Sequence, residues 1–351
     1  DHSEEKLSLT ARAAGTDMSG GPLTSSVVVD MMAHMNTFIE LGDRYAVAEP
    51  GLLFRDFDAH TKEKGLEMPG YPASRNIAAL GGMVGNNAGG EKHLKYGKTA
   101  EYVEEINVVL ADGNEHVLSA DPSRDDAYVA ELRARIRELV TTNASVIEAA
   151  KPVVKKNSSG YALWDLGATT NLARLLVGSQ GALGIITRIR FGLVKPKPFS
   201  SMVIIFLNDL TQLGTVVPQV LSHHPDSFES YDDHTFSLAI KYFPEFAAQM
   251  KTGIIPLGIS FLPELWMLIT GGVPKLVLLV EFRADTQEAA LKCAERLAQE
   301  LQRESSTSIR IAKDARAAEK YWAIRRESFA LLRKKVRGKR TAPFIDDFVV
   351  P

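Results

Sequence analysis

The sequence of 351 residues has almost no cysteine, since Cys293 is the only one. A single cysteine excludes an intramolecular disulfide, and it excludes an iron–sulfur cluster or a cysteine-ligated zinc site built by this chain alone. An excess of one charge is also lacking, because 41 Lys and Arg face 43 Asp and Glu and the formal net charge is −2. This balance gives no reason to expect a nucleic-acid partner. We also predict no metal site.

Long hydrophobic runs are absent as well, so no segment is predicted to span a membrane. The nearest to such a run, residues 254–270, is interrupted by Pro256, Pro263 and Glu264. It is expected to be a buried core segment, with a lid or membrane-surface element as the alternative. Residues 333–340 hold six basic side chains, which are typical of a solvated loop or of a contact with anionic lipid or an acidic partner. We expect a cytoplasmic protein, with peripheral binding at the inner face of the membrane as an alternative.

The predicted elements change in character once along the chain, near residues 195–198, which read Lys-Pro-Lys-Pro. We therefore predict one domain over residues 1–198 and a second over 199–351. The first residue is not Met, and the sequence stops at Pro351 directly after an apolar run. We expect a segment of a longer protein, with part of the first domain and part of the second lying beyond its two ends.

Residue patterns predict a mixture of strands and helices in both domains. In the first domain, the elements are strands at 26–30, 45–49, 102–110, 115–118 and 184–194, and helices at 54–64 and 126–150. In the second, they are strands at 202–207, 275–282 and 307–311, and helices at 210–221, 286–301 and 315–334. The second set is typical of a ferredoxin-like α+β domain.

Glycine is concentrated in three segments of the first domain. The first segment, residues 12–21, reads Arg-Ala-Ala-Gly-Thr-Asp-Met-Ser-Gly-Gly and precedes a predicted strand. Successive backbone N–H groups in such a turn form a concavity that binds phosphate oxygens. The spacing matches neither the Walker A pattern nor G-x-G-x-x-G, which disfavours a nucleoside triphosphatase or a Rossmann site. Taken alone, this segment is also compatible with a plain glycine turn.

The second segment runs from Pro72 to Gly97, and residues 81–90 contain five glycines interleaved with asparagine. Backbone of this kind can lie close along a cofactor because no side chains stand in the way. The third segment, residues 177–187, places glycines at every third position between a short helix at 171–176 and a β-branched strand. A strand edge there could bind a flat heterocycle, and a helix-to-strand turn without a ligand is the alternative.

Together the three segments resemble those of the FAD-linked oxidase family, which has the vanillyl-alcohol-oxidase-type fold. Its D-lactate dehydrogenase, glycolate oxidase and D-2-hydroxyglutarate dehydrogenase branch typically reads R-G-x-G-T-x-x-S-G-G, G-G-x-x-x-x-N-A-G-G-x-x-x-L-K-Y-G and G-S-E-G-T-L-G-I-I-T. All three motifs occur here in order, and residues 49–51, Glu-Pro-Gly, match a fourth short motif. The resemblance is strong over residues 7–198 and loose over 199–351.

The resemblance implies an α+β protein in which a two-subdomain FAD-binding domain precedes an incomplete ferredoxin-like substrate or cap domain. It implies FAD as the cofactor, with the pyrophosphate held by the first two segments. The implied FAD-binding residues are Arg12, Ala14, Gly15, Thr16, Asp17, Ser19, Gly20, Pro72, Ser74, Gly81, Gly82, Asn86, Gly89, Gly90, Tyr96, Gly97, Gly178, Gly181, Gly184 and Ile185.

Three residues depart from the family pattern. Asp17 replaces a small uncharged residue, and a carboxylate beside pyrophosphate is unfavourable unless it points away. Gln180 replaces the common Glu and so loses a charge, and Ala13 replaces a common Gly, which would carry a cost if its φ were positive.

The implied substrate is a small hydroxy acid that gives a hydride from C2 to the flavin. Residues 321–327 resemble the family's tryptophan–arginine helix, in which an Arg binds the substrate carboxylate. We assign this role to Arg325, with Arg326 and a purely solvated Arg325 as the alternatives. The family's histidine-rich motif, H-x-G-D/E-G-N-x-H, which supplies a base and metal ligands, does not occur in the sequence. Residues 344–351 resemble the strand that precedes it.

The sequence thus predicts a flavin-dependent oxidoreductase for a D-2-hydroxy acid such as lactate, glycolate or 2-hydroxyglutarate. Electrons would pass to a quinone, a cytochrome, or an iron–sulfur partner or domain. Two alternatives remain, an FAD-dependent alcohol or sugar oxidase that uses O₂ and a non-catalytic FAD-binding subunit of a larger redox complex. The missing histidine motif favours the last.

Overall fold

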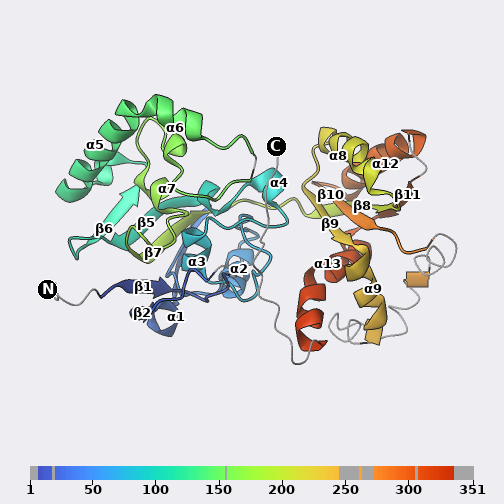
Figure 1. Cartoon of the computed structure of the whole chain (residues 1–351), viewed down its shortest axis with the longest axis horizontal. Coiled ribbons are helices and arrows are strands. Elements are labelled where there is room, and N and C mark those ends of the chain that lie inside the picture. The colour runs from blue at the N-terminus through green and yellow to red at the C-terminus, as the bar shows by residue number, and fades with distance from the viewer. Residues whose placement is uncertain are drawn as a thin grey trace. The chain divides into compact units, whose positions relative to one another are not determined.

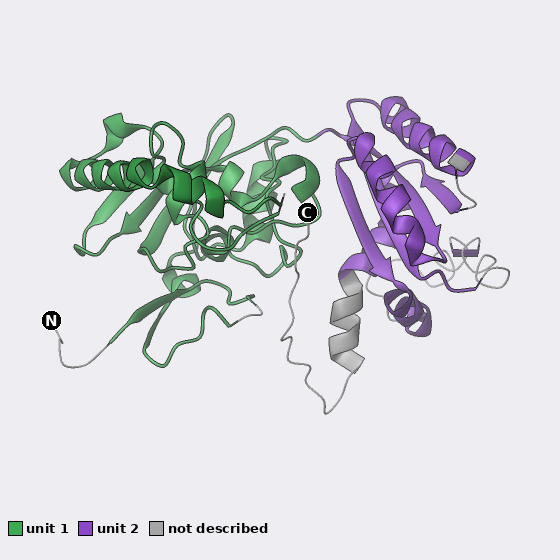
Figure 2. Cartoon of the chain, turned by 45° about the horizontal axis from the view of Figure 1, so that its top comes forward, with its two compact units in different colours: residues 1–196, 342–351 green, residues 197–341 purple. Residues whose placement is uncertain are grey.

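The computed structural model describes residues 7–17, 20–154, 156–244, 261–262, 272–304 and 307–335 (Figure 1). These residues form two compact units, and the chain passes from one to the other between Pro196 and Lys197 (Figure 2). Each unit has its own sheet and its own hydrophobic core. Of the predicted segment 254–270, only residues 261–262 are described.

Unit 1 is built on a five-stranded antiparallel sheet with the order β3-β4-β7-β5-β6. Its strands are β3 (Phe38–Leu41), β4 (Tyr45–Ala48), β5 (Val103–Val109), β6 (Glu115–Ser119) and β7 (Ile185–Gly192). A separate parallel pair consists of β1 (Leu9–Arg12) and β2 (Val27–Asp30). The predicted hairpin is confirmed, because β5 pairs with β6 in antiparallel register.

Short helices pack around this sheet. They are α1 (Met31–His34), α2 (Phe54–Lys62), α3 (Leu80–Gly85), α4 (His93–Tyr96), α5 (Ala127–Thr142), α6 (Ala144–Ala150) and α7 (Leu172–Leu176). Asp126 starts α5 by accepting the Val129 N–H at 2.9 Å, and Asn171 starts α7 in the same way. The helical structure predicted over 126–150 is confirmed, except that the chain leaves helical geometry at Asn143, which separates α5 from α6.

The core of unit 1 fixes the position of the glycine-rich helix α3. Leu80, Met83 and Val84 are buried among apolar side chains that include Phe57 and Phe191, whose rings meet edge to face at 5.5 Å. Burying each such side chain stabilises the fold by about 1.5–3 kcal/mol. These apolar residues hold one side of α3 against the core. The glycines of α3 are therefore available for contacts outside the core.

Unit 2 is a four-stranded antiparallel sheet with the order β11-β8-β10-β9. Its elements are β8 (Phe199–Leu207), α8 (Leu213–Ser222), β9 (Ser227–Asp232), α9 (Asp233–Lys241), β10 (Leu276–Ala284), α12 (Gln287–Glu304), β11 (Ser308–Ala312) and α13 (Ala315–Lys335). The order of these strands and of the crossover helices α8 and α12 is that of a ferredoxin-like fold. The α+β class predicted for both domains is confirmed.

Strand β8 is buried on both faces, which separates the core of unit 2 into two layers. Met202, Ile204 and Phe206 share a cluster with residues of α9 and α13, whereas Val203 and Ile205 share one with residues of α8 and α12. This alternation follows from the opposite directions of successive side chains along a strand. Among the described residues, no helix is both long enough and apolar enough to cross a bilayer.

Candidate functional site

The three glycine-rich segments of unit 1 meet along one groove, which encloses a cavity of about 180 Å³. The groove is lined by Ala11, Ala13, Ala14, Gly15, Thr16, Asp17, Gly21, Pro22, Met31, Pro50, Pro72, Ser74, Ala78, Ala79, Gly81, Gly82, Met83, Gly85, Asn86, Ala88, Gln180, Gly181, Gly184 and Ile186. Segments separated by more than a hundred residues of sequence therefore share one surface.

The second segment enters the groove through α3, and close backbone contacts explain its glycines. The Gly81 N–H donates to the Pro50 carbonyl at 2.7 Å, and a Cβ on Gly81 would lie only 2.6 Å from the Pro50 Cβ. A Cβ on Gly82 would meet Ala13 of the first segment at 3.5 Å. Gly81 is therefore required for packing, whereas Gly82 faces the first segment.

The third segment is held directly on the end of α3. The Gly178 N–H donates to the Val84 carbonyl and the Gln180 N–H to the Gly85 carbonyl, both at 2.9 Å. The Gln180 side chain adds a third bond, from Nε2 to Asn86 Oδ1 at 3.0 Å. Gln180 has a φ of +56°, a conformation that non-glycine residues adopt only when their surroundings fix it. These bonds supply that constraint.

The first segment folds around its own charged side chains. A Cβ on Gly15 would lie 2.8 Å from Arg12 Nε, so the guanidinium covers this glycine, which has a φ of +62°. Asp17 Oδ2 accepts the Gly21 N–H at 2.7 Å. Ala13 is not among the non-glycine residues with positive φ, so the cost considered for an alanine at this position does not arise.

Charge is scarce in the groove. Asp17 is the only charged residue among the described residues that line it, and the remaining polar lining is Thr16, Ser74, Asn86 and Gln180. A groove of glycine and small residues exposes backbone, and backbone N–H groups can hold phosphate oxygens without a cation. The composition of the lining is compatible with a phosphate-bearing ligand, except at Asp17.

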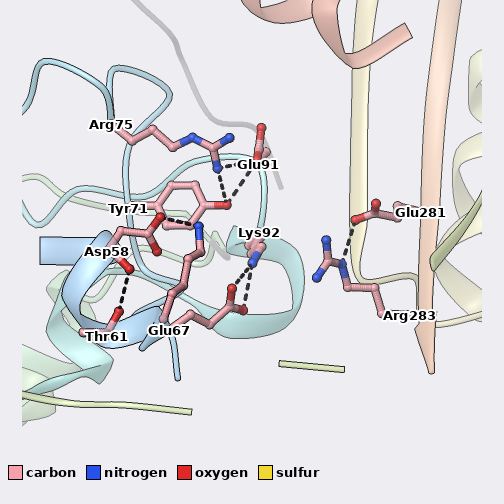
Figure 3. Close-up of polar contacts among 10 residues, drawn as sticks. Asp58, Thr61, Glu67, Tyr71, Arg75, Glu91, Lys92, Glu281 and Arg283 are labelled. Carbon is pink, nitrogen blue, oxygen red and sulfur yellow. Dashed lines mark hydrogen bonds and ion pairs between the residues drawn. The ribbon is translucent and has the colours of Figure 1, made fainter. Parts of the chain in front are cut away.

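A network of polar side chains connects residues that directly precede the second glycine-rich segment with residues inside that segment (Figure 3). The Lys92 ammonium lies 2.8 and 2.7 Å from the two carboxylate oxygens of Glu67, and both side chains are about nine-tenths buried. Arg75 donates to the Tyr71 hydroxyl at 2.9 Å, and that hydroxyl donates to Glu91 at 3.1 Å. Burial, followed by the nearby Glu91 charge, raises the pKa of Tyr71. Sequence reasoning missed this network, because its members carry no motif.

The predicted cofactor residues fall into two groups. Those that line the groove are Ala14, Gly15, Thr16, Asp17, Pro72, Ser74, Gly81, Gly82, Asn86, Gly181 and Gly184. Those that lie in the same segments outside the lining are Arg12, Gly20, Gly89, Gly90, Tyr96, Gly97, Gly178 and Ile185. Ser19 and residues 336–351 lie outside the described residues.

A second cavity in unit 1, of about 170 Å³, was not predicted. Residues 157–160 and Trp164 line it together with Lys98 and Gly178. The Lys98 ammonium donates to the Asn157 carbonyl, and burial, followed by the charge of Arg174, lowers the pKa of Lys98. No spacing of residues 157–164 in the sequence indicated this arrangement.

Arg325, the predicted substrate anchor, belongs to α13 of unit 2. Its Nε and Nη2 atoms each lie 3.2 Å from Glu229 Oε2 on β9, and 42% of its side chain is exposed. Arg326 instead stacks on Trp322, with the guanidinium carbon 4.9 Å from the ring centroid. The Arg325 side chain is therefore partly exposed, and a carboxylate fixes the direction of its guanidinium.

One group of three potential metal ligands occurs in the described part of the chain, at Asp232, Asp233 and His234. Asp233 is paired with Lys275 at 3.0 Å, and the His234 side chain is 89% exposed. Exposed groups of this kind are common without a bound ion.

Comparison with known proteins agrees with the two units. Residues 2–119 match the family profile described as FAD binding domain, and residues 197–351 match that of the FAD linked oxidases, C-terminal domain. Both descriptions name the cofactor predicted from the glycine-rich segments, which is FAD.

Related proteins match over long stretches at low identity. The D-2-hydroxyglutarate dehydrogenase of Pseudomonas putida is 26% identical over 99% of this chain, which spans 35% of that protein. The D-lactate dehydrogenase of Archaeoglobus fulgidus is 26% identical over 84% of this chain and 53% of its own length. The glycolate oxidase subunit GlcD of Bacillus subtilis is 31% identical over 56% of this chain and 33% of its own length. The chain thus spans about a third to a half of these relatives.

A solved structure of alkyldihydroxyacetonephosphate synthase superposes with a TM-score of 0.65 at 15% sequence identity. It covers 93% of this chain, and this chain covers 51% of it. At this identity the likeness concerns the fold. The order of the glycine-rich segments, the fold of each unit and the two family profiles lead to one conclusion: the chain belongs to the FAD-linked oxidase family.

Proposed function

We propose that the chain is the FAD- and substrate-binding part of a flavin-dependent oxidoreductase that takes a hydride from C2 of a D-2-hydroxy acid. The observation that carries this proposal is the single groove to which all three glycine-rich segments contribute. The names of the relatives, which include D-2-hydroxyglutarate and D-lactate dehydrogenases, support the substrate class.

The groove would hold FAD chiefly through backbone. The first segment, around Gly15 and Thr16, and the second, around Gly82 and Asn86, present small residues to the same space. A larger side chain at Gly82 would enter that space, because only Ala13 lies within contact distance of its Cβ position. FAD, when bound, supplies the hydride acceptor for the reaction.

Arg325 would hold the substrate carboxylate. A guanidinium offers two parallel N–H groups to a carboxylate, and about 1.5–3 kcal/mol is typical for hydrogen bonds to charged groups. Glu229 contacts the Nε and Nη2 atoms of Arg325 through a single oxygen, Oε2. This contact orients the guanidinium and leaves its other N–H groups for a ligand.

The proposal includes the identity of the substrate and of the electron acceptor. D-Lactate, glycolate and D-2-hydroxyglutarate are the candidate substrates, and a quinone, a cytochrome or an iron–sulfur partner would accept the electrons. A second candidate function is a non-catalytic FAD-binding subunit, because the groove by itself accounts for cofactor binding without substrate turnover.

The two functions differ in whether a hydroxy acid reduces the bound flavin. The purified chain, loaded with FAD, is mixed anaerobically with each of the three acids and with L-lactate as a control of configuration. Bleaching of the flavin absorption by one of the three acids, without bleaching by L-lactate, is the expected result. An FAD-loaded chain that no hydroxy acid bleaches would support the non-catalytic subunit.

A further inference from the structure

Asp17 places a carboxylate in a groove that has no cation in its described lining. Its Oδ2 atom lies 2.7 Å from the Gly21 nitrogen, which is the donor of a short hydrogen bond. A Cβ built on Gly21 would meet the same oxygen at 2.7 Å and Gln180 Oε1 at 3.4 Å. Oxygens of the first and third segments therefore both lie close to Gly21, and Asp17 Oδ2 accepts its N–H.

This arrangement differs from that of an occupied phosphate site. In a backbone cradle for phosphate, the N–H groups of the turn are taken up by phosphate oxygens. Here the carboxylate of the same turn takes one of them. Arg12, the only Lys or Arg between residues 7 and 26, lies over Gly15 and is not part of the groove lining. Among the described residues that line it, the groove therefore has one negative charge and no positive charge. A pyrophosphate would bring two further negative charges.

We propose that Asp17 is an internal competitor for the pyrophosphate of FAD: its carboxylate occupies the Gly21 N–H in the free protein and must move away before the cofactor binds. The inference rests on the proposed function, in that the groove is the FAD site. Asp17 would then set the affinity for any ligand that carries a pyrophosphate, and it would stabilise the first segment in the free protein.

The test is a comparison of binding constants at low ionic strength, where repulsion between charges is least screened. Calorimetry measures FAD, ADP and riboflavin binding to the FAD-free wild-type chain, to Asp17→Asn and to Asp17→Ser. Asp43→Asn is the matched control, since Asp43 is an exposed residue of unit 1 outside the groove lining. ADP carries a pyrophosphate without a flavin, and riboflavin carries a flavin without a phosphate.

Asp17→Ser should bind FAD and ADP about tenfold more tightly than wild type, a factor that corresponds to about 1.4 kcal/mol. Asp17→Asn loses the charge but keeps an oxygen that can accept the Gly21 N–H, so its gain should be smaller. Riboflavin affinity should stay unchanged, and Asp43→Asn should behave as wild type. The gain should shrink as salt is added. Equal FAD and ADP affinities in wild type and both Asp17 variants would overturn the inference while leaving the FAD site intact. An equal gain for riboflavin would overturn it too, because the effect would not act on pyrophosphate. Absence of FAD and ADP binding in every variant would overturn the proposed function together with the inference.

Discussion

Removing one member of the buried Glu67–Lys92 pair should destabilise unit 1 strongly. The side chains are 10% and 9% exposed, and the ammonium contacts both carboxylate oxygens at 2.8 and 2.7 Å. Lys92→Met would leave the Glu67 carboxylate buried without its partner. Breaking a buried pair in this way costs about 3–5 kcal/mol, whereas replacing both charges by apolar groups is often neutral. The double variant Glu67→Leu with Lys92→Met should therefore be close to wild type in stability.

Urea unfolding of wild type, Lys92→Met, Glu67→Leu and the double variant, followed by circular dichroism, measures the effect. The Lys62–Asp58 pair, which is 2.5 Å apart with side chains 63% and 22% exposed, provides a less buried control. Lys62→Met should lower the free energy of unfolding by only about 0.3–0.5 kcal/mol. A loss of less than about 1 kcal/mol in Lys92→Met, or a double variant as unstable as the sum of the single variants, would refute this reasoning.

Three further outcomes are expected. Gly82→Val should abolish FAD retention, measured as flavin absorbance per chain after gel filtration, because its side chain enters the groove. Arg325→Ala should raise the substrate KM by about tenfold or more and leave FAD content unchanged. His116 should make stability depend on pH. Its burial lowers its pKa, but hydrogen bonds to Asp126 and Asp112 outweigh burial and raise the pKa of His116. A raised pKa gives stabilisation below the ordinary value of about 6.5 that is lost as pH rises through the folded-state value. Unfolding free energies measured from about pH 6 to about pH 8 should fall in wild type more than in His116→Gln.

Each of these expectations has a control and a contradicting result. Gly214→Val, on a helix of unit 2, should keep wild-type FAD content, and full FAD content in Gly82→Val would remove Gly82 from the site. An unchanged KM in Arg325→Ala, with a raised KM in Arg326→Ala, would move the carboxylate anchor to Arg326. The same pH dependence in His116→Gln as in wild type would show that His116 is not the responsible group.

Local patterns predicted those elements whose sequence of apolar and polar residues matches their burial in the fold. Strand β8 is buried on both faces and reads as a continuous apolar run, so it was predicted from sequence. Strand β9, with the sequence Ser-Phe-Glu-Ser-Tyr-Asp, was missed because it is an edge strand with polar residues. The break at Asn143 was missed because neither Gly nor Pro marks it in the sequence.

The glycine-rich segments were recognisable, but the reasons for individual glycines were not. Gly81 is glycine because Pro50 packs against it, and a Cβ on Gly184 would lie 2.6 Å from Val108 Cγ2. Both contacts join residues far apart in sequence, so they follow from the fold. The same holds for the Glu67–Lys92 pair, whose members are 25 residues apart. Sequence reasoning named the segments that form the groove, and the fold determines which of their atoms face it.

The most direct test of the account is a titration of the FAD-free chain with FAD, followed by the quenching of flavin fluorescence. The groove predicts saturable binding of one FAD per chain, and ADP should compete because it shares the pyrophosphate and adenosine parts of the cofactor. Absence of saturable binding, or binding that ADP does not reduce, would contradict the assignment of this groove as the FAD site.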